Sequence, residues 1–364
     1  MKILITGNMG YVGPGVVSHL RKTFPEATLV GYDMAYFASS LTNASLLPEH
    51  SLDVQLFGDV RNMSADVLEG VTAVVHLAAI SNDPMGNKYE QITLDVNYRS
   101  SVAIAKMAKA AGVGSFIFAS SCSVYGAAGD QAKNESSALN PLTAYAKSKV
   151  FTELDLEHLA DADFKITCLR FATACGMSDR LRLDLVLNDF VAAAVVSGRI
   201  SILSDGSPWR PLIHVKDMAR AIEWGVLRDI ANGGEFVSVN AGSDEWNYQV
   251  KDLAEAVVAV IPGTTVHLNT EAVPDKRSYR VDFELFRQLA PNHQPVYTLN
   301  QTITELYESL VAMKFSNVEF RDSLLMRLKL LTSLQEREYI NEELEWNHKP
   351  NLRAEAQPSL ETAK

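Results

Sequence analysis

The sequence contains little cysteine and no long uncharged apolar run. Its three cysteines, Cys122, Cys168 and Cys175, are an odd number without C-x-x-C spacing, which favours neither a disulfide framework nor a zinc site. No apolar stretch approaches the ~18 residues that span a bilayer, and the first residues lack the pattern of a secretory signal peptide. His76 and His214 stand in apolar stretches without spaced acidic or histidine partners. We therefore expect a cytoplasmic protein with no membrane segment and no metal site.

Basic segments are also absent. The chain has 33 lysines and arginines against 44 acidic residues, a net charge of −11, and no cationic block that could neutralise a nucleic-acid backbone. The 47% hydrophobic and 21% charged content is typical of a globular protein. Its 364 residues suffice for one large domain or two, at roughly 150 residues per domain. The expected partner is a small molecule and not a nucleic acid.

Short apolar runs alternate with helical patterns through the first half of the chain. The runs cover residues 2–6, 27–33, 73–80, 115–121 and 165–171, and the helical patterns include residues 96–111 and 144–159. Such alternation is typical of a parallel sheet covered by helices on both faces. It predicts an α/β protein with a Rossmann-type doubly wound parallel sheet.

The alternation weakens after about Gly176. We expect a dinucleotide-binding Rossmann domain over residues 1–176 and a smaller, mixed α/β, mainly substrate-binding portion over residues 177–318, some segments of which return to the first domain. Residues 319–364 are expected to form a helical C-terminal extension that ends in a frayed polar tail.

Three early glycines suggest a phosphate-binding turn. In ITGNMGYVGPG, Gly7, Gly10 and Gly13 follow an apolar run and precede a helical pattern. In that context they permit a tight turn, approach of a pyrophosphate to backbone N–H groups and close helix packing. The alternative is that these glycines only form a turn at the surface and bind no phosphate. Asp33 lies 20 residues after Gly13, near the ~20-residue offset of a carboxylate that accepts ribose hydroxyls, which favours NAD over NADP.

The stretch YAKSK places Tyr145 and Lys149 four residues apart, on one face of a helix. A tyrosine has a reference pKa of ~10, which a nearby ammonium and a cationic nicotinamide ring would lower. The pair could therefore shuttle a proton, although a surface Tyr/Lys pair is the alternative. The hydroxyl-rich stretch FASSCSVYG ends a predicted strand, where parallel strands form a ligand crevice.

Several motifs occur together in a fixed order over residues 1–282. They are GNMGYVG, GYD, GDV, HLAA, DVNYRS, SSCSVYG, YAKSK, LRFATACG and RPLIHVKDMA. In this the chain resembles the extended short-chain dehydrogenase/reductases, specifically the NAD-dependent nucleotide-sugar epimerase/dehydratase group. The resemblance implies bound NAD, a nucleotide-diphosphate sugar as substrate, and a homodimer formed through the helices at 96–111 and 144–159.

The resemblance also implies roles for single residues. Tyr145, Lys149 and Ser121 would be catalytic, with Lys149 on the nicotinamide ribose and Ser121 on the reacting sugar hydroxyl. The expected cofactor-binding residues are Gly7, Met9, Gly10, Tyr11, Val12, Gly13, Asp33, Asp59, Val60, Leu77, Ala78, Ala79, Asn97, Ser120, Tyr145, Lys149 and Phe171. The expected substrate-binding residues are Ser81, Ser121, Ser123, Thr173, Asn188, Arg210, Arg277 and Arg280.

Two parts of the substrate side stay open in the sequence. Arg277 and Arg280 are alternative clamps for the diphosphate, and Thr173 replaces the asparagine that the family usually has at this position. The leucine- and arginine-rich segment 180–188 is expected to surround the base and the first phosphate, or else to be a surface helix.

The positions after Ser121 help to separate the reactions of the group. Relatives that remove water across carbons 5 and 6 resemble T-D-E here, whereas this chain has Cys122 and Ser123 and therefore no carboxyl group at these positions. Cys122 is expected to be a buried structural thiol. The pattern favours a 4-epimerase that works through a transient 4-keto sugar. A nucleotide-sugar 4-ketoreductase, a 4,6-dehydratase and a non-catalytic NAD-binding module are the alternatives.

Overall fold

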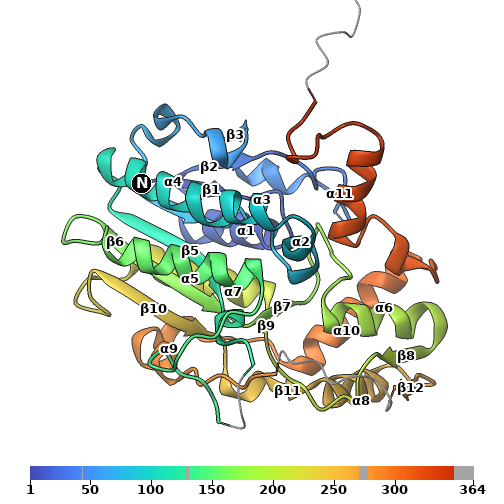
Figure 1. The fold of residues 1–364 in the computed structure, drawn as a ribbon. Coiled ribbons are helices and arrows are strands. Elements are labelled where there is room, and N and C mark those ends of the chain that lie inside the picture. The colour runs from blue at the N-terminus through green and yellow to red at the C-terminus, as the bar shows by residue number, and fades with distance from the viewer. Residues whose placement is uncertain (43, 128–130, 270–277, 348–364) are drawn as a thin grey trace, which may run out of the picture.

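Seven parallel strands form the centre of the molecule (Figure 1). The computed structural model describes residues 1–42, 44–127, 131–269 and 278–347. The strands lie in the order β10-β6-β5-β4-β1-β2-β3, and all neighbours are parallel. Their bounds are β1 Lys2–Thr6, β2 Thr28–Asp33, β3 Val54–Phe57, β4 Ala73–His76, β5 Ser115–Ser121, β6 Lys165–Phe171 and β10 Phe236–Ala241. The predicted doubly wound parallel sheet is confirmed.

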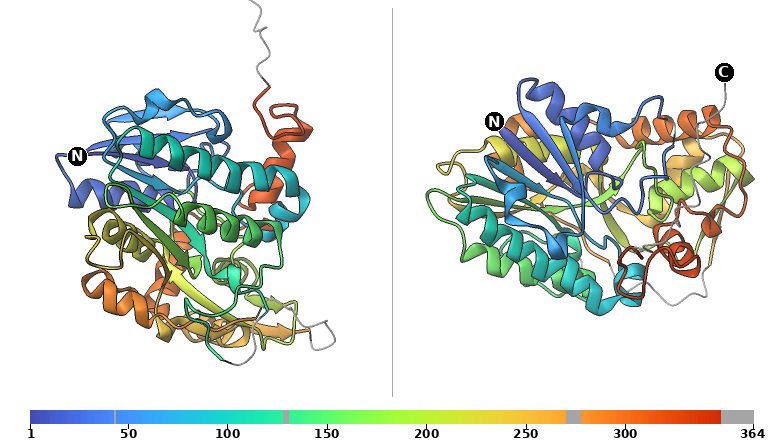
Figure 2. Two further views of the ribbon diagram at one scale, coloured as in Figure 1. Left: turned by 60° about the vertical axis from the view of Figure 1, so that its left-hand side comes forward. Right: turned by 90° about the horizontal axis from the view of Figure 1, so that it is seen from above.

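Helices cover both faces of this sheet. Helices α1 and α7 pack together on one face, and α4 and α5 lie on the other (Figure 2). Side chains of β1 alternate accordingly, because Ile3 and Ile5 join the core under α1, whereas Leu4 joins the core under α4. The helices of this half are α1 Gly13–Thr23, α2 Asp83–Lys88, α3 Glu90–Leu94, α4 Ser100–Ala110, α5 Ala144–Glu157 and α7 Val215–Leu227.

The sheet departs from the prediction at its edges and at one strand end. The edge strand β3 was not predicted, because its side chains are at most half-buried and leave no run of core residues. Strand β10 lies beyond Gly176, where the alternation of strands and helices weakens, but it pairs with β6 along its whole length as the seventh strand. Strand β4 ends at His76, so that residues 77–80 leave the sheet as a loop.

The C-terminal portion contains two small sheets. The first is mixed, with β9 Trp209–His214 antiparallel to β11 Asn247–Gln249 and parallel to β7 Thr173–Cys175. The second pairs β8 Arg199–Ile202 with β12 Thr265–Leu268 in parallel. The helices are α6 Val186–Ser197, α8 Val250–Val260, α9 Glu284–Leu289, α10 Leu299–Ala312 and α11 Arg327–Glu336. A smaller, mixed C-terminal portion is thus confirmed.

Helix α11 belongs to the last part of the chain but lies beside α2 of the first half (Figure 1). The predicted polar tail from residue 349 lies outside the described residues. No helix within the described ranges is long and apolar enough to cross a membrane.

Candidate active site

A cavity of about 500 Å³ opens at the carboxyl ends of the parallel strands. In open α/β sheets this edge is where ligands bind. The predicted site residues that line it are Gly7, Gly10, Tyr11, Val12, Asp33, Val60, Leu77, Ala78, Ala79, Ser81, Ser120, Ser121, Ser123, Tyr145, Lys149, Phe171, Thr173 and Arg210. The fold therefore brings residues from both halves of the chain to one cavity.

The glycine turn between β1 and α1 has no room for side chains at two positions. Gly7 has φ +75°, and a Cβ there would lie 2.5 Å from the backbone nitrogen of Ala78. A Cβ at Gly13 would lie 1.9 Å from the carbonyl oxygen of Asn8. The backbone thus turns tightly into the N-terminus of α1, where N–H groups and the helix dipole favour an anion. The turn fits the pyrophosphate of a dinucleotide.

Asp33 ends β2 and is held against this turn. Its carboxylate accepts hydrogen bonds from the backbone N–H of Met9 at 3.0 Å and of Ala35 at 2.7 Å. Burial raises the pKa of Asp33, and these two hydrogen bonds lower it in part. A carboxylate fixed at the end of the second strand has the chemistry to accept ribose hydroxyls and to repel a 2′-phosphate.

Tyr145 and Lys149 emerge from the first turns of α5, whose start is capped by the Thr143 side chain. The side chain of Ser121, at the end of β5, interacts with the Tyr145 hydroxyl and lowers its pKa. The Lys149 ammonium donates to the carbonyl oxygen of Ala119 at 2.6 Å and lies 5.6 Å from the centroid of the Tyr145 ring. A phenol, a hydroxyl and an ammonium thus meet at the cavity wall.

The two titratable groups are shifted by burial in opposite directions. Burial raises the pKa of Tyr145 to about 12, and the interaction with the Ser121 side chain lowers it only in part. Burial lowers the pKa of Lys149 to about 7, with the negative charge of Glu153 opposing this shift. Desolvation of the phenolate is therefore the largest influence on the pKa of Tyr145, and it raises the pKa where the sequence predicted a lowering.

A buried ion pair lies behind these residues. Glu153, one helical turn after Lys149 on α5, accepts from Arg170 of β6, with 2.6 Å between Arg170 Nη2 and Glu153 Oε2. Glu153 also accepts from the Ser120 hydroxyl, and Arg170 donates to the Tyr125 hydroxyl at 3.2 Å. Because these bonds join α5 to β5 and β6, they fix the helix that carries Tyr145 on the sheet.

Some predicted site residues lie outside the cavity wall. Those within the described ranges are Met9, Gly13, Asp59, Asn97, Asn188 and Arg280. Asn97 is fully buried and uses both ends of its amide on the backbone of Ile80, at 2.8 and 3.0 Å. It therefore shapes the loop that follows β4. The Asp59 carboxylate pairs with Arg61 at 2.5 Å.

Asn188 also acts within the fold. Its side chain accepts from the Gly176 N–H at 3.0 Å and donates to the Tyr11 hydroxyl at 3.0 Å, and so ties α6 to the glycine turn and to the residue after β7. Arg280 lies with its guanidinium carbon 4.8 Å from the ring centroid of Trp209. Arg277 lies outside the described residues.

The far side of the cavity carries the substrate candidates. Arg210 reaches it from β9 and donates to the carbonyl oxygen of Trp209 at 2.9 Å, while Thr173 reaches it from β7. The Ser123 hydroxyl is buried and has no hydrogen-bond partner among the described residues. A polar ligand in the cavity would satisfy that hydroxyl.

Sequence reasoning missed several polar residues of the cavity. Arg182 makes two bonds of 2.7 Å to the Asp184 carboxylate and donates to the Ser81 hydroxyl at 2.9 Å. Asn82 donates to Asp184 at 2.5 Å. Asp83 lines the cavity and accepts from the Thr143 hydroxyl at 2.7 Å. The arginine-rich segment 180–188 was a signal for the first pair, but no local pattern marked Asn82 or Asp83.

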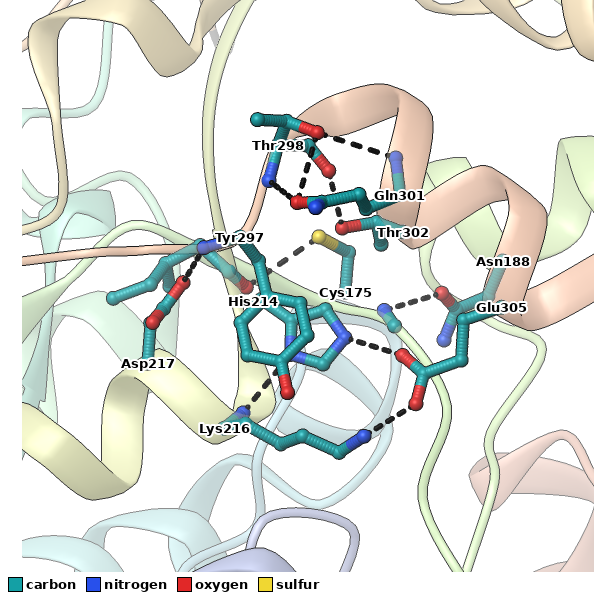
Figure 3. Close-up of polar contacts among 12 residues, drawn as sticks. Cys175, Asn188, His214, Lys216, Asp217, Tyr297, Thr298, Gln301, Thr302 and Glu305 are labelled. Atoms are coloured by element: carbon teal, nitrogen blue, oxygen red, sulfur yellow. Dashed lines mark hydrogen bonds and ion pairs between the residues drawn. The ribbon is translucent and has the colours of Figure 1, made fainter.

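His214 does not line the cavity. It belongs to a cluster of polar contacts at the start of α7 (Figure 3). Its imidazole lies 2.9 Å from the Glu305 carboxylate and stacks on Tyr297 at 4.1 Å. Glu305 also pairs with Lys216, so the cluster joins the start of α7 to α10. Within the part of the chain that the structure describes, no group of three or more histidine, cysteine or acidic side chains is placed to hold a metal.

Comparisons with known proteins agree with this geometry. Residues 3–242 match the family described as NAD dependent epimerase/dehydratase family. An uncharacterised UDP-glucose epimerase of Bacillus subtilis is 26% identical over 84% of this chain and 96% of its own length. A dTDP-D-glucose 4,6-dehydratase of Mus musculus is 24% identical over 77% of this chain and 78% of its own length.

Solved structures of related proteins share the fold. The UDP-glucuronic acid 4-epimerase of Bacillus cereus, solved with UDP-glucuronic acid and NAD, superposes with a TM-score of 0.72 at 22% identity, covering 86% of this chain and 100% of that one. The matched family range contains the glycine turn, Asp33 and the Tyr145 and Lys149 pair. The chain belongs to the NAD-dependent epimerase/dehydratase family, whose cofactor is NAD, and its predicted membership of that family is confirmed.

Proposed function

We propose that this protein is an NAD-dependent nucleotide-sugar epimerase that acts at carbon 4 through a transient 4-keto sugar. The observation that carries this proposal is that Tyr145, Ser121 and Lys149 line the same cavity as the glycine turn and Asp33. The chain thus combines a dinucleotide site with a proton-transfer site at the edge of one sheet.

The proposed roles follow from position. Tyr145 takes the proton of the sugar 4-hydroxyl and later returns it, and Ser121 orients that hydroxyl through its own side chain. Lys149 holds the nicotinamide ribose. When bound, NAD supplies the hydride acceptor and donor for carbon 4 and adds positive charge that favours the tyrosinate. Since hydride leaves one face of the sugar and returns to the other, no reduced cofactor is consumed.

A nucleotide-diphosphate sugar is the proposed substrate. Arg210 offers a planar charged fork at the cavity wall, which suits a diphosphate. Ser81, Ser123 and Thr173 offer hydroxyls to the sugar and its phosphates. Arg280 is a further candidate clamp. In support, relatives and structural neighbours are described as enzymes of UDP- and dTDP-sugars.

A dehydratase is the second candidate, because one carboxyl group does reach the reactive part of the cavity. Asp83 lines the wall, and its charge acts on the Tyr145 hydroxyl. Cys122 does not compete for such a role, because its thiol is buried and directed to the carbonyl oxygen of Arg170 at 3.0 Å. A 4-ketoreductase would use the same tyrosine but would consume reduced cofactor.

A panel of UDP-, dTDP-, GDP- and CDP-sugars, incubated with the protein and NAD alone, tests the proposal. Epimerisation gives a product of unchanged mass, dehydration removes one water, and reduction needs added NADH. Tyr145→Phe is expected to abolish turnover while NAD stays bound, and Tyr297→Phe, outside the cavity wall, serves as the control. A Tyr145→Phe enzyme that turns over like wild type would refute the proposed proton transfer.

We also propose a homodimer formed through α4 and α5. Two apolar side chains on α5 are exposed, Phe151 by 41% and Leu154 by 52%, as in a helix that packs against a partner. Light scattering of wild type should give the mass of two chains. Leu154→Arg should give the mass of one chain. Leu203→Arg replaces another exposed leucine, which follows β8 in the C-terminal portion, and should leave the dimer intact. A monomeric wild type would contradict this assignment.

A further inference from the structure

The C-terminal segment, residues 319–347, returns to the cofactor end of the cavity. The Trp346 indole donates to the carbonyl oxygen of Met34, just after Asp33, at 2.5 Å. Leu331 and Leu344 line the cavity wall and belong to a buried cluster with residues of the loop after β4 and of α2. The family match ends at residue 242, so this segment lies beyond the part of the chain that is shared with the family profile.

Arg327, the first residue of α11, is the charged side chain of this segment that lines the cavity. It is only 1% exposed. Its Nη2 donates to the carbonyl oxygen of Arg180 at 2.8 Å, and its guanidinium carbon lies 4.2 Å from the Phe37 ring centroid. Its Nη1 has no hydrogen-bond partner among the described residues. One donor of a buried cation is therefore free for a ligand.

Among the residues that the structure describes, no carboxylate forms an ion pair with Arg327. Arg180 is paired with Glu49 through two bonds of 2.7 and 3.0 Å. Arg182 is paired with Asp184 in the same bidentate manner. Burial and the positive charges of Arg182 and Arg180 lower the pKa of Arg327, with Asp184 opposing them. A buried cation in excess is costly unless an anion joins it.

The position of Arg327 along the dinucleotide follows from its neighbours. Phe37 lies four residues after Asp33, at the expected adenosine ribose. Arg182 donates a hydrogen bond to Ser81, and its positive charge lowers the pKa of Tyr145 at the expected nicotinamide end. A group between these two ends faces the diphosphate that joins the two nucleosides.

We propose that Arg327 binds the diphosphate of the dinucleotide and completes the anion site that the glycine turn begins. Backbone N–H groups before α1 and a guanidinium from α11 would then hold the same group from two elements. The inference rests on the cofactor part of the proposed function and not on its sugar chemistry. It makes the C-terminal segment part of the cofactor site, so NAD and the folded segment stabilise each other.

Titration calorimetry with NAD, ADP and adenosine tests this proposal. Arg327→Met removes the charge but keeps an unbranched apolar side chain, and it is expected to weaken NAD and ADP binding about ten- to hundredfold while adenosine binding changes less than about twofold. Arg327→Lys keeps the charge and should recover part of the ADP affinity. Lys329→Gln removes an exposed charge from the same helix and should bind all three ligands like wild type.

Two outcomes would overturn the assignment. The first is unchanged NAD and ADP affinity in Arg327→Met, and the second is an equal loss for adenosine, which lacks phosphate. Where the variant does not fold, a crystal structure of wild type with bound NAD decides. A guanidinium nitrogen of Arg327 is expected within about 3.5 Å of a phosphate oxygen, and a separation above about 5 Å refutes the contact. Normal NAD binding without sugar turnover would contradict the proposed reaction alone.

Discussion

Replacing Arg170 by methionine is expected to destabilise the protein by about 3–5 kcal/mol, the usual cost of removing one partner of a buried ion pair. Arg170 and Glu153 are only 7% and 5% exposed. Arg170 Nε lies 3.1 and 3.0 Å from the two Glu153 oxygens, and its Nη2 lies 2.6 Å from one of them. Methionine fills much of the space but leaves the buried Glu153 carboxylate without its ion-pair partner.

The same reasoning predicts that a second substitution restores stability. In the double variant Arg170→Met, Glu153→Leu both members of the ion pair are removed, and it is expected to be about 2 kcal/mol more stable than Arg170→Met alone. The single variant also acquires a pH dependence. An unpaired buried carboxylate favours its protonated form, so the folded variant binds more protons than the unfolded chain. Its loss relative to wild type is therefore larger near pH 8 than near pH 5.

Urea unfolding followed by far-UV circular dichroism measures these differences, with wild type, Arg170→Met, Glu153→Leu and the double variant compared at both pH values. A loss below about 1 kcal/mol for Arg170→Met would refute the reasoning. So would a double variant that loses the sum of the two single losses, because the two residues would then be uncoupled.

Three further predictions concern the cofactor turn and the reactive pair. Asp33→Asn should weaken NAD binding about tenfold or more and reduce the preference for NAD over NADP, measured by calorimetry; an unchanged preference would show that this carboxylate does not contact the ribose. Gly13→Ala should lower NAD affinity and thermal stability together, because its Cβ would lie 1.9 Å from the Asn8 carbonyl oxygen. Gly70→Ala is the control: a Cβ there meets no neighbouring atom, so this variant measures only the cost of an alanine at the positive φ of +67°. Burial lowers the pKa of Lys149 from 10.5 to about 7, so above pH 7 the unfolded state binds more protons than the folded state. As pH rises from about 7 to 10, the stability of wild type should therefore increase relative to that of Lys149→Met. A difference in melting temperature that does not change over this range would contradict the burial effect.

The pattern of the sequence predicted the elements whose residues lie close together in the chain. Continuous apolar runs such as residues 2–6 and 165–171 predicted buried parallel strands, because both faces of such strands are covered. The spacing of Tyr145 and Lys149 predicted a shared helix face, and the structure places both on α5 at the cavity. The glycine spacing predicted the turn in which Gly7 and Gly13 have no room for a Cβ.

Burial overrode the local expectation at several positions. The pKa of Tyr145 depends on how much water the fold removes from the phenol, which no spacing reveals. Asn97 was expected at the cofactor from its motif, yet its amide is used on the backbone of Ile80. The place of strand β10 in the main sheet was not predicted, because its pairing partner, β6, lies about seventy residues earlier in the chain and leaves no local pattern.

The sequence by itself determined the sheet, the glycine turn, Asp33 and the Tyr145 pair, because each depends on periodicity or spacing within one or two elements. Only the tertiary structure decided which distant charged groups also line the cavity, namely Asp83, Arg182 and Arg327. Their positions follow from how the loop after β4 and helix α11 pack on the sheet. The physical reason is that a hydrogen bond or a charge acts over a few ångströms in space, whereas a sequence pattern records neighbours along the chain.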